Sequence, residues 1–163
     1  MKNYLIAAVA AASLFGTTAI AADYTSIVIE RPVNASADDT WKKIGPYCSL
    51  AEWLDAPCEI TKGNGWDVGS IRSIAGGRVT EILVSKTRYS YTYTFAPPNP
   101  TAYHGHLEVL PEGAKKSKIV YTLFYDQEPS GTAEAKAADK AQRTKRFTAG
   151  VEKMVKMAEG QKP

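Results

Sequence analysis

The stretch RYSYTYTFAPPNPTAYHGHLEV, residues 88–109, holds two alternating segments separated by prolines. In the first segment every second residue is aromatic: Tyr89, Tyr91, Tyr93 and Phe95. The second segment begins at Tyr103 and places Leu107 on the same face. Residues two apart in a strand point to one side of a sheet, so the stretch predicts two strands, each with one aromatic or apolar face.

Further strands are predicted on both sides of this stretch. Short runs rich in β-branched and aromatic residues are separated by glycine and proline turns, a pattern typical of antiparallel sheets. A turn is expected at 111–113, where Pro-Glu-Gly precedes the last strand. The other predicted strands are YTSIVIERPV (24–33), CEITK (58–62), GSIRSI (69–74), RVTEILVSK (78–86) and SKIVYTLFY (117–125).

Helical patterns lie at three places. Ser36 followed by Asp39 resembles a capping box and predicts a short helix, and SLAEWL (49–54) predicts a second one. A long helix is predicted from Thr132 to about Gly160, and its apolar stripe is Phe147, Val151, Met154, Val155 and Ala158. This is the only long amphipathic element that can cover the apolar face of the sheet. The sequence therefore predicts an α+β fold in which the sheet wraps around the final helix.

The N-terminus predicts export. Lys2 precedes an apolar run at 4–20 that ends in small residues, so 1–21 is interpreted as a signal peptide cleaved near Ala21. Residues 22–163 then form one secreted or periplasmic domain. No later stretch approaches the roughly 20 apolar residues of a membrane span, so no transmembrane segment is expected after cleavage.

The charge is nearly balanced, with a formal net charge of +3. Such a chain lacks the strong positive field of nucleic-acid-binding proteins, so no nucleic acid partner is expected. Basic residues do cluster in KAQRTKR, 140–146, within the predicted long helix. We interpret that cluster as a solvent-facing helix surface.

Cys48 and Cys58 are the only cysteines. In an exported chain they favour a disulfide, which would close a short loop. A zinc site is the alternative, but CxxC spacing is absent and two cysteines cannot complete a tetrahedral shell.

The order of these elements resembles the START-like, or SRPBCC, superfamily, and within it the polyketide cyclase/dehydrase and lipid-transport group. The resemblance spans about Ile27 to Met157. It implies a helix-grip (Bet v 1-like) fold, with a seven-stranded curved antiparallel sheet, two short helices, a long C-terminal helix and a cavity for an apolar or aromatic small molecule. The matching segments are VNASADDTWKKI, LAEWL, GNGWDVGSIRSI, GGRVTEIL, the Tyr-x-Tyr strand, PPNPTAYHGHLEV, IVYTLFY and FTAGVEKMVKM.

Six tyrosines are expected on or near the inner face of the sheet. A core built only for packing would favour aliphatic side chains, since each buried hydroxyl without a partner costs roughly 1–3 kcal/mol. A ligand cavity is therefore favoured over packing alone, and packing stays open as the alternative. The expected ligand-binding residues are Tyr89, Tyr91, Tyr93, Phe95, Tyr103, Leu107, Tyr121, Tyr125, Phe147, Val151, Met154 and Trp53.

Arg72 and Glu81 match positions where the resembling family often carries an arginine and an acidic residue. We expect a salt bridge at the cavity mouth with a structural role, and keep open an anchor for a ligand carboxylate or a catalytic role. His104 and His106 share the face opposite Tyr103 and are expected to face solvent. No metal or cofactor is expected.

Three functions follow from these observations. The favoured one is an exported binding protein for a hydrophobic or aromatic ligand, such as a lipid or a polyketide-like metabolite. The second is a cyclase or dehydratase-type enzyme that uses Arg72 or Glu81 with a tyrosine as proton donor. The third is an envelope protein-interaction module.

Overall fold

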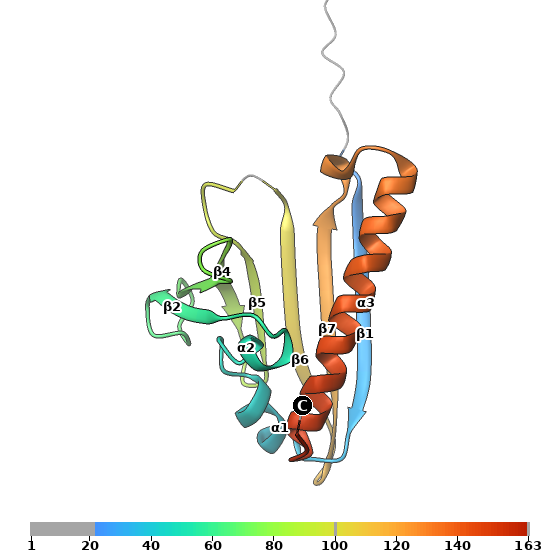
Figure 1. The fold of residues 1–163 in the computed structure, drawn as a ribbon. Helices are drawn as coiled ribbons and strands as arrows, with labels where there is room; N and C mark the ends of the chain where they lie inside the picture. The colour runs from blue at the N-terminus through green and yellow to red at the C-terminus, as the bar shows by residue number, and fades with distance from the viewer. Residues whose placement is uncertain (1–21, 100, 163) are drawn as a thin grey trace, which may run out of the picture.

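The computed structural model describes residues 22–99 and 101–162, so the predicted signal peptide at 1–21 lies outside the described residues. Seven strands form one antiparallel sheet in the order β1-β7-β6-β5-β4-β3-β2 (Figure 1). The strands are β1 (Tyr24–Val33), β2 (Cys58–Lys62), β3 (Ile71–Ile74), β4 (Val79–Lys86), β5 (Ser90–Phe95), β6 (Tyr103–Gly113) and β7 (Lys116–Asp126). The helices are α1 (Ala37–Ile44), α2 (Leu50–Trp53), η1 (Glu128–Ser130) and α3 (Ala133–Ala158). The predicted α+β helix-grip fold is confirmed.

The helices α1 and α3 begin at capping side chains. The hydroxyl of Ser36 accepts a hydrogen bond of 3.1 Å from the backbone N–H of Asp39 at the start of α1. Thr132 does the same for Ala135 at the start of α3, over 3.2 Å. Each cap satisfies a backbone donor that the first helical turn leaves open, which explains why both helices start where the sequence predicted.

The turn predicted at 111–113 is wrong by a few residues. β6 continues to Gly113, and the reversal occurs at 114–115. Pro111 pairs with Ser117 inside the ladder, next to a register shift that ends at Gly113. Proline is tolerated in a strand beside such a bulge, so the proline signal marked an irregularity rather than the turn itself.

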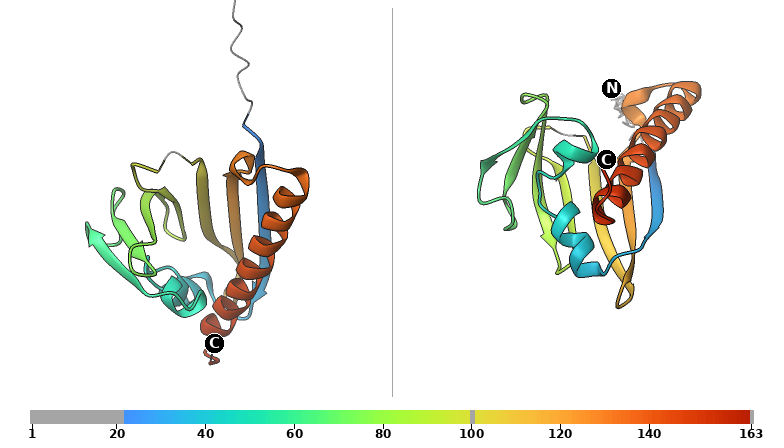
Figure 2. Two further views of the ribbon diagram at one scale, coloured as in Figure 1. Left: turned by 45° about the horizontal axis from the view of Figure 1, so that its top comes forward. Right: turned by 60° about the horizontal axis from the view of Figure 1, so that its bottom comes forward.

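The sheet curves, so its two ends stand at different distances from α3 (Figure 2). The C-terminal half of α3 lies on β1 and β7, and Val151 and Met154 are completely buried there. The strands β2, β3 and β4 stand away from α3 across an intervening space, where α2 lies. Among the described residues, no helix has the length and apolar character needed to cross a bilayer.

Cys48 and Cys58 form the expected disulfide, with their α-carbons 5.5 Å apart. This separation lies within the roughly 4.4–6.8 Å that a disulfide requires. The bond ties the segment before α2 to the first residue of β2 and leaves no free cysteine among the described residues. The alternative of a zinc site with cysteine ligands is therefore excluded.

Candidate functional site

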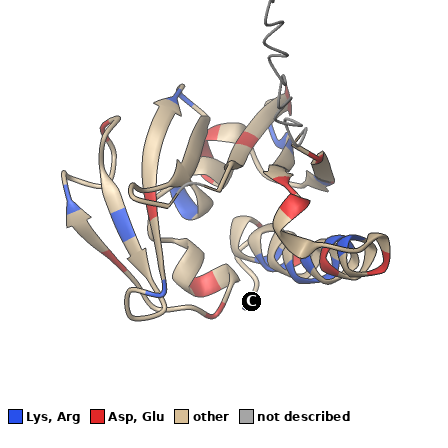
Figure 3. Ribbon diagram, turned by 90° about the horizontal axis from the view of Figure 1, so that it is seen from above, with Lys and Arg blue, Asp and Glu red and all other residues tan. Residues whose placement is uncertain are grey.

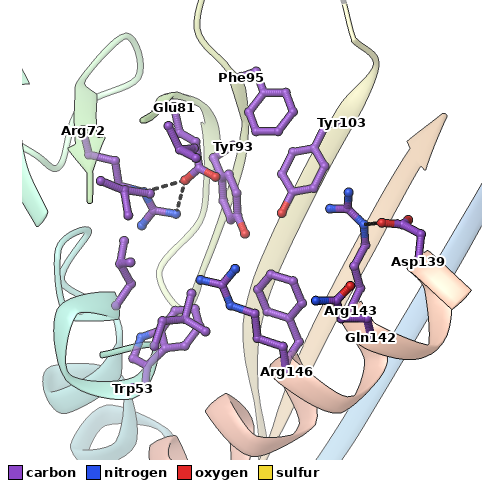
Figure 4. A pocket seen from close by; sticks show the side chains of 15 residues that line it. Trp53, Arg72, Glu81, Tyr93, Phe95, Tyr103, Asp139, Gln142, Arg143 and Arg146 are labelled. Atoms are coloured by element: carbon purple, nitrogen blue, oxygen red, sulfur yellow. Dashed lines mark hydrogen bonds and ion pairs between the residues drawn. The ribbon is translucent and has the colours of Figure 1, made fainter. Parts of the chain in front are cut away.

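A cavity of about 260 Å³ lies between the sheet and α3 (Figure 4). Strands β3 to β6 form one wall, α2 forms one end, and the N-terminal half of α3 forms the opposite wall. Apolar lining comes from Trp53, Leu54, Ile74, Val79, Phe95 and Phe147. Apolar walls with a few polar groups are typical of small-molecule sites.

Aromatic rings along β5 and β6 build one side of the cavity. Phe95 stacks on Tyr103 with ring centroids 4.3 Å apart and planes within 9° of parallel. Tyr93 lies next along β5, with its ring centroid 6.2 Å from that of Tyr103. Because Tyr93 and Phe95 are two residues apart, the strand turns both rings to the same face. The alternation in the sequence is thus the direct cause of an aromatic wall.

A buried ion pair lies at the inner side of this wall. Arg72 on β3 is the direct register partner of Glu81 on β4. Two nitrogens of Arg72, Nε and Nη2, lie 2.8 Å and 2.7 Å from the same carboxylate oxygen, Oε2 of Glu81. Arg72 also donates to the backbone carbonyl of Tyr47. The exposed fractions of Arg72 and Glu81 are only 1% and 4%, so the salt bridge expected from the sequence forms inside the protein.

Tyrosine rings enclose the Arg72 guanidinium. Its central carbon lies 4.1 Å from the ring centroid of Tyr47 and 4.5 Å from that of Tyr93. Cation–π contacts of this kind contribute about 2 kcal/mol or more when the cation is desolvated. With its nitrogens held by Glu81 and Tyr47, Arg72 is a fixed positive charge in the cavity wall.

The ion pair with Arg72 engages only one of the two carboxylate oxygens of Glu81. Both bonds from Arg72 reach one carboxylate oxygen, and among the described residues no hydrogen bond reaches the other. Burial raises the pKa of the Glu81 carboxyl, while the charge and hydrogen bonds of Arg72 act in the opposite direction. The carboxyl therefore lines the cavity with one oxygen able to accept a hydrogen bond from a ligand.

The tyrosine hydroxyls are neutral donors at physiological pH. Tyr93 shares a hydrogen bond with Tyr121 across β6. Burial raises the pKa of both hydroxyls well above the ordinary value of 10.0, and it also raises the pKa of Tyr103. Gly105 on β6 makes this arrangement possible, because a Cβ at that position would lie 2.1 Å from the ring carbon that bears the Tyr93 hydroxyl.

The structure brings together only part of the predicted ligand-binding set. Trp53, Tyr93, Phe95, Tyr103 and Phe147 line the cavity, together with Arg72 and Glu81. The other predicted residues of the inner face are buried in the core instead of lining it: Tyr91, Leu107, Tyr121, Tyr125, Val151 and Met154. Strand alternation and helical spacing correctly predicted that these side chains face inward. Neither pattern tells where along a strand or helix the core ends and a cavity begins.

Tyr89 has a different position from the other aromatic residues of the opening stretch. It precedes β5, is half-buried, and its hydroxyl donates to Asp38 over 2.7 Å near the start of α1. Tyr89 therefore does not line the cavity, because this hydrogen bond holds its ring at the end of the strand beside α1.

Sequence reasoning missed the polar wall on α3. The cluster 140–146 was interpreted as solvent-facing, and α3 does carry charges along its length (Figure 3). Yet Gln142, Arg143 and Arg146 also line the cavity, with Asp139. A signal was present in the spacing, because residues three or four apart on a helix share a face and these side chains lead directly to Phe147.

The two histidines lie on the outer face, as predicted from parity. His104 is exposed, and the Nδ1 atom of His106 lies 2.9 Å from the Thr92 hydroxyl. Within 22–99 and 101–162, no group of three or more histidine, cysteine or acidic side chains is placed to hold a metal ion.

A comparison with family models matches residues 24–159 to the family described as polyketide cyclase / dehydrase and lipid transport. No curated protein sequence matches the chain.

Solved structures share the fold at low sequence identity. A protein of Thermobifida fusca is 20% identical with a TM-score of 0.68, covering 82% of this chain and 92% of its own. The ZhuI aromatase/cyclase of Streptomyces is 15% identical with a TM-score of 0.67, covering 84% and 94%. Norcoclaurine synthase of Thalictrum flavum, in complex with dopamine and hydroxybenzaldehyde, is 21% identical with a TM-score of 0.63, covering 87% and 90%.

Proposed function

The chain belongs to the polyketide cyclase/dehydrase and lipid transport family, and on that premise we propose that it binds a small hydrophobic or aromatic molecule in the cavity between the sheet and α3. One observation carries the proposal: a cavity with an aromatic wall lies beside a core of buried side chains. Two of the similar structures are an aromatase/cyclase and a synthase that holds aromatic ligands, which supports an aromatic ligand here as well.

The size of the cavity limits the ligand. Its volume of about 260 Å³ lies just below the roughly 300–1,000 Å³ of pockets for drug-sized ligands. A molecule with one or two rings fits inside, whereas a lipid with two acyl chains would extend beyond it. The stacked pair of Phe95 and Tyr103 offers a flat surface for such a ring.

A matched pair of variants on β4 tests the proposal. Val79 lines the cavity and Val84 lies on the outer face of the same strand. Native mass spectrometry and tryptophan fluorescence, with 2-naphthamide and a library of small aromatic and acyl compounds, should detect binding to the natural protein. Val79→Phe should weaken binding at least tenfold and Val84→Phe should leave it unchanged. Equal binding by both variants, or an empty protein throughout, contradicts the proposal.

Catalysis in the same cavity is a second candidate function. Arg72 leaves one oxygen of Glu81 open, and burial raises the pKa of this carboxyl, as in many proton-transfer sites. Compounds extracted from the natural protein and from Glu81→Gln distinguish the two functions. A chemically different compound on the variant supports turnover, whereas the same compound on both supports binding alone.

We further propose that the protein acts outside the cytoplasm, as the predicted signal peptide indicates. The disulfide between Cys48 and Cys58 supports this, because such bonds persist in oxidising compartments. Mass spectrometry of fractionated cells should find the chain without residues 1–21 in the exported fraction. An intact N-terminus in the cytoplasmic fraction contradicts the proposal.

A further inference from the structure

Five charged side chains line the cavity, and four of them neutralise one another. Arg72 pairs with Glu81 at the inner wall. Arg143 pairs with Asp139 on α3, where its Nε atom lies 3.0 Å and 2.8 Å from the two carboxylate oxygens. Arg146 is the fifth, and no acidic group among the described residues lies within ion-pair distance of it. The lining therefore carries one positive charge without a partner.

Arg146 is placed to meet a ligand. Figure 4 shows its side chain extending from α3 into the space between Trp53 and Tyr93. The carboxylate of Asp55, which follows the lining residue Leu54, is bound by Lys153 instead. The nearby carboxylates are thus engaged elsewhere, and Arg146 is left facing the cavity.

Arg143, on the same helix, has a structural role because both an acidic side chain and an aromatic ring hold its guanidinium. Its guanidinium is held by Asp139 and lies 4.6 Å from the ring centroid of Tyr125. Arg146 has no such acidic partner, and its central guanidinium carbon lies farther from an aromatic ring in its cation–π contact, 5.9 Å from the ring centroid of Phe147. Its fork of N–H donors remains open for a planar anion.

We infer that the ligand is an organic monoanion whose carboxylate is bound by Arg146 at the cavity mouth while its ring lies against Phe95 and Tyr103. This inference rests on the proposed function. One unpartnered cation matches one negative charge, and near a protein surface such a pair attracts more strongly than it does in bulk water. The neutral hydroxyl of Tyr103, a lining residue, adds a donor that also suits a ligand rich in acceptor oxygens.

The test compares two probes of nearly the same shape, 2-naphthoate and 2-naphthamide, which differ in charge. Calorimetry on the full mature chain should show that the natural protein prefers the acid by roughly tenfold, as expected for a hydrogen-bonded ion pair. Arg146→Gln should remove that preference, so that the acid and the amide bind with similar affinity. Lys145→Gln is the matched control, because Lys145 is an exposed neighbouring cation outside the lining, and it should retain the preference.

The outcomes separate the inference from the function on which it rests. Equal affinities for acid and amide in the natural protein, or an unchanged preference in Arg146→Gln, overturn the inference and leave the binding function standing. Loss of the preference in Lys145→Gln as well also overturns it, because a general field rather than Arg146 would then select the anion. Failure of both probes to bind overturns the inference and counts against the cavity as a site for two-ring ligands.

Discussion

The two halves of α3 face the same sheet, but one half packs into the core and the other lines the cavity. All the buried residues of α3 lie at or after Phe147, where Val151 and Met154 fill the space against β1 and β7. The half before Phe147 faces the cavity with polar and charged side chains. Buried apolar side chains occupy the first space, whereas polar and charged side chains line the second without filling it. In a helix-grip fold, the side chains of the helix therefore determine whether the facing part of the sheet is buried in the core or lines a binding cavity.

The largest expected effect comes from replacing a charged group of the cavity lining with an apolar side chain, as if this region were core. Glu81→Leu leaves the Arg72 guanidinium buried without a counter-charge and should lower the free energy of unfolding by about 3–5 kcal/mol. The double variant Arg72→Met with Glu81→Leu should recover most of that loss. Urea unfolding monitored by circular dichroism measures both. A mild loss in the single variant would mean that water reaches Arg72.

The second effect sharpens the contrast along α3. Met154→Ala removes a completely buried side chain and should lower the free energy of unfolding by about 2–5 kcal/mol. Gln142→Ala, in the half that faces the cavity, should stay within about 0.5 kcal/mol because the side chain is exposed. Similar losses in the two variants, measured by urea unfolding, would show that the two halves are packed alike.

The third effect concerns the end of the cavity at α2. Reducing the disulfide between Cys48 and Cys58 should lower the stability by about 2–3 kcal/mol, since it releases a short loop. Trp53 lies within that loop and lines the cavity, so ligand binding should also weaken. Circular dichroism should still report an intact sheet. An unchanged melting temperature after complete reduction would contradict this role.

The fourth and smallest expected effect, counted per residue, is a loss of folding stability at alkaline pH caused by the buried tyrosines. Burial raises the pKa of Tyr91, Tyr93 and Tyr121 above the value of 10.0 that they have when unfolded. Their contribution to stability is therefore fully present below pH 10 and is lost as the pH rises toward the folded-state pKa. Each tyrosine should cost up to about 1.4 kcal/mol per pH unit in that window. Unfolding free energies measured at a series of pH values, with ultraviolet absorbance reporting phenolate, test the onset.

The sequence was sufficient for most of the fold. Alternation, capping residues and glycine turns placed the seven strands and the helices, because these signals are local. Tyr93 and Phe95 were found through the same alternation. The core role of Tyr91 and the cavity role of Arg146 were not, because both depend on how far the curved sheet stands from α3. That distance arises from packing among residues far apart in the chain, such as Val151 against the strands, and no short pattern encodes it.

Gly105 gives the cavity a property that belongs to none of its lining residues. The Tyr93 ring lies over this glycine, and any side chain there would have to push the ring aside. A substitution as small as Gly105→Ala, at a position that does not line the pocket, would therefore change the pocket width by displacing the Tyr93 ring. In a lineage of related proteins, or in a directed-evolution experiment, this position would act as a size selector: changes at Gly105 would alter which ring systems fit while every group that touches the ligand stays the same.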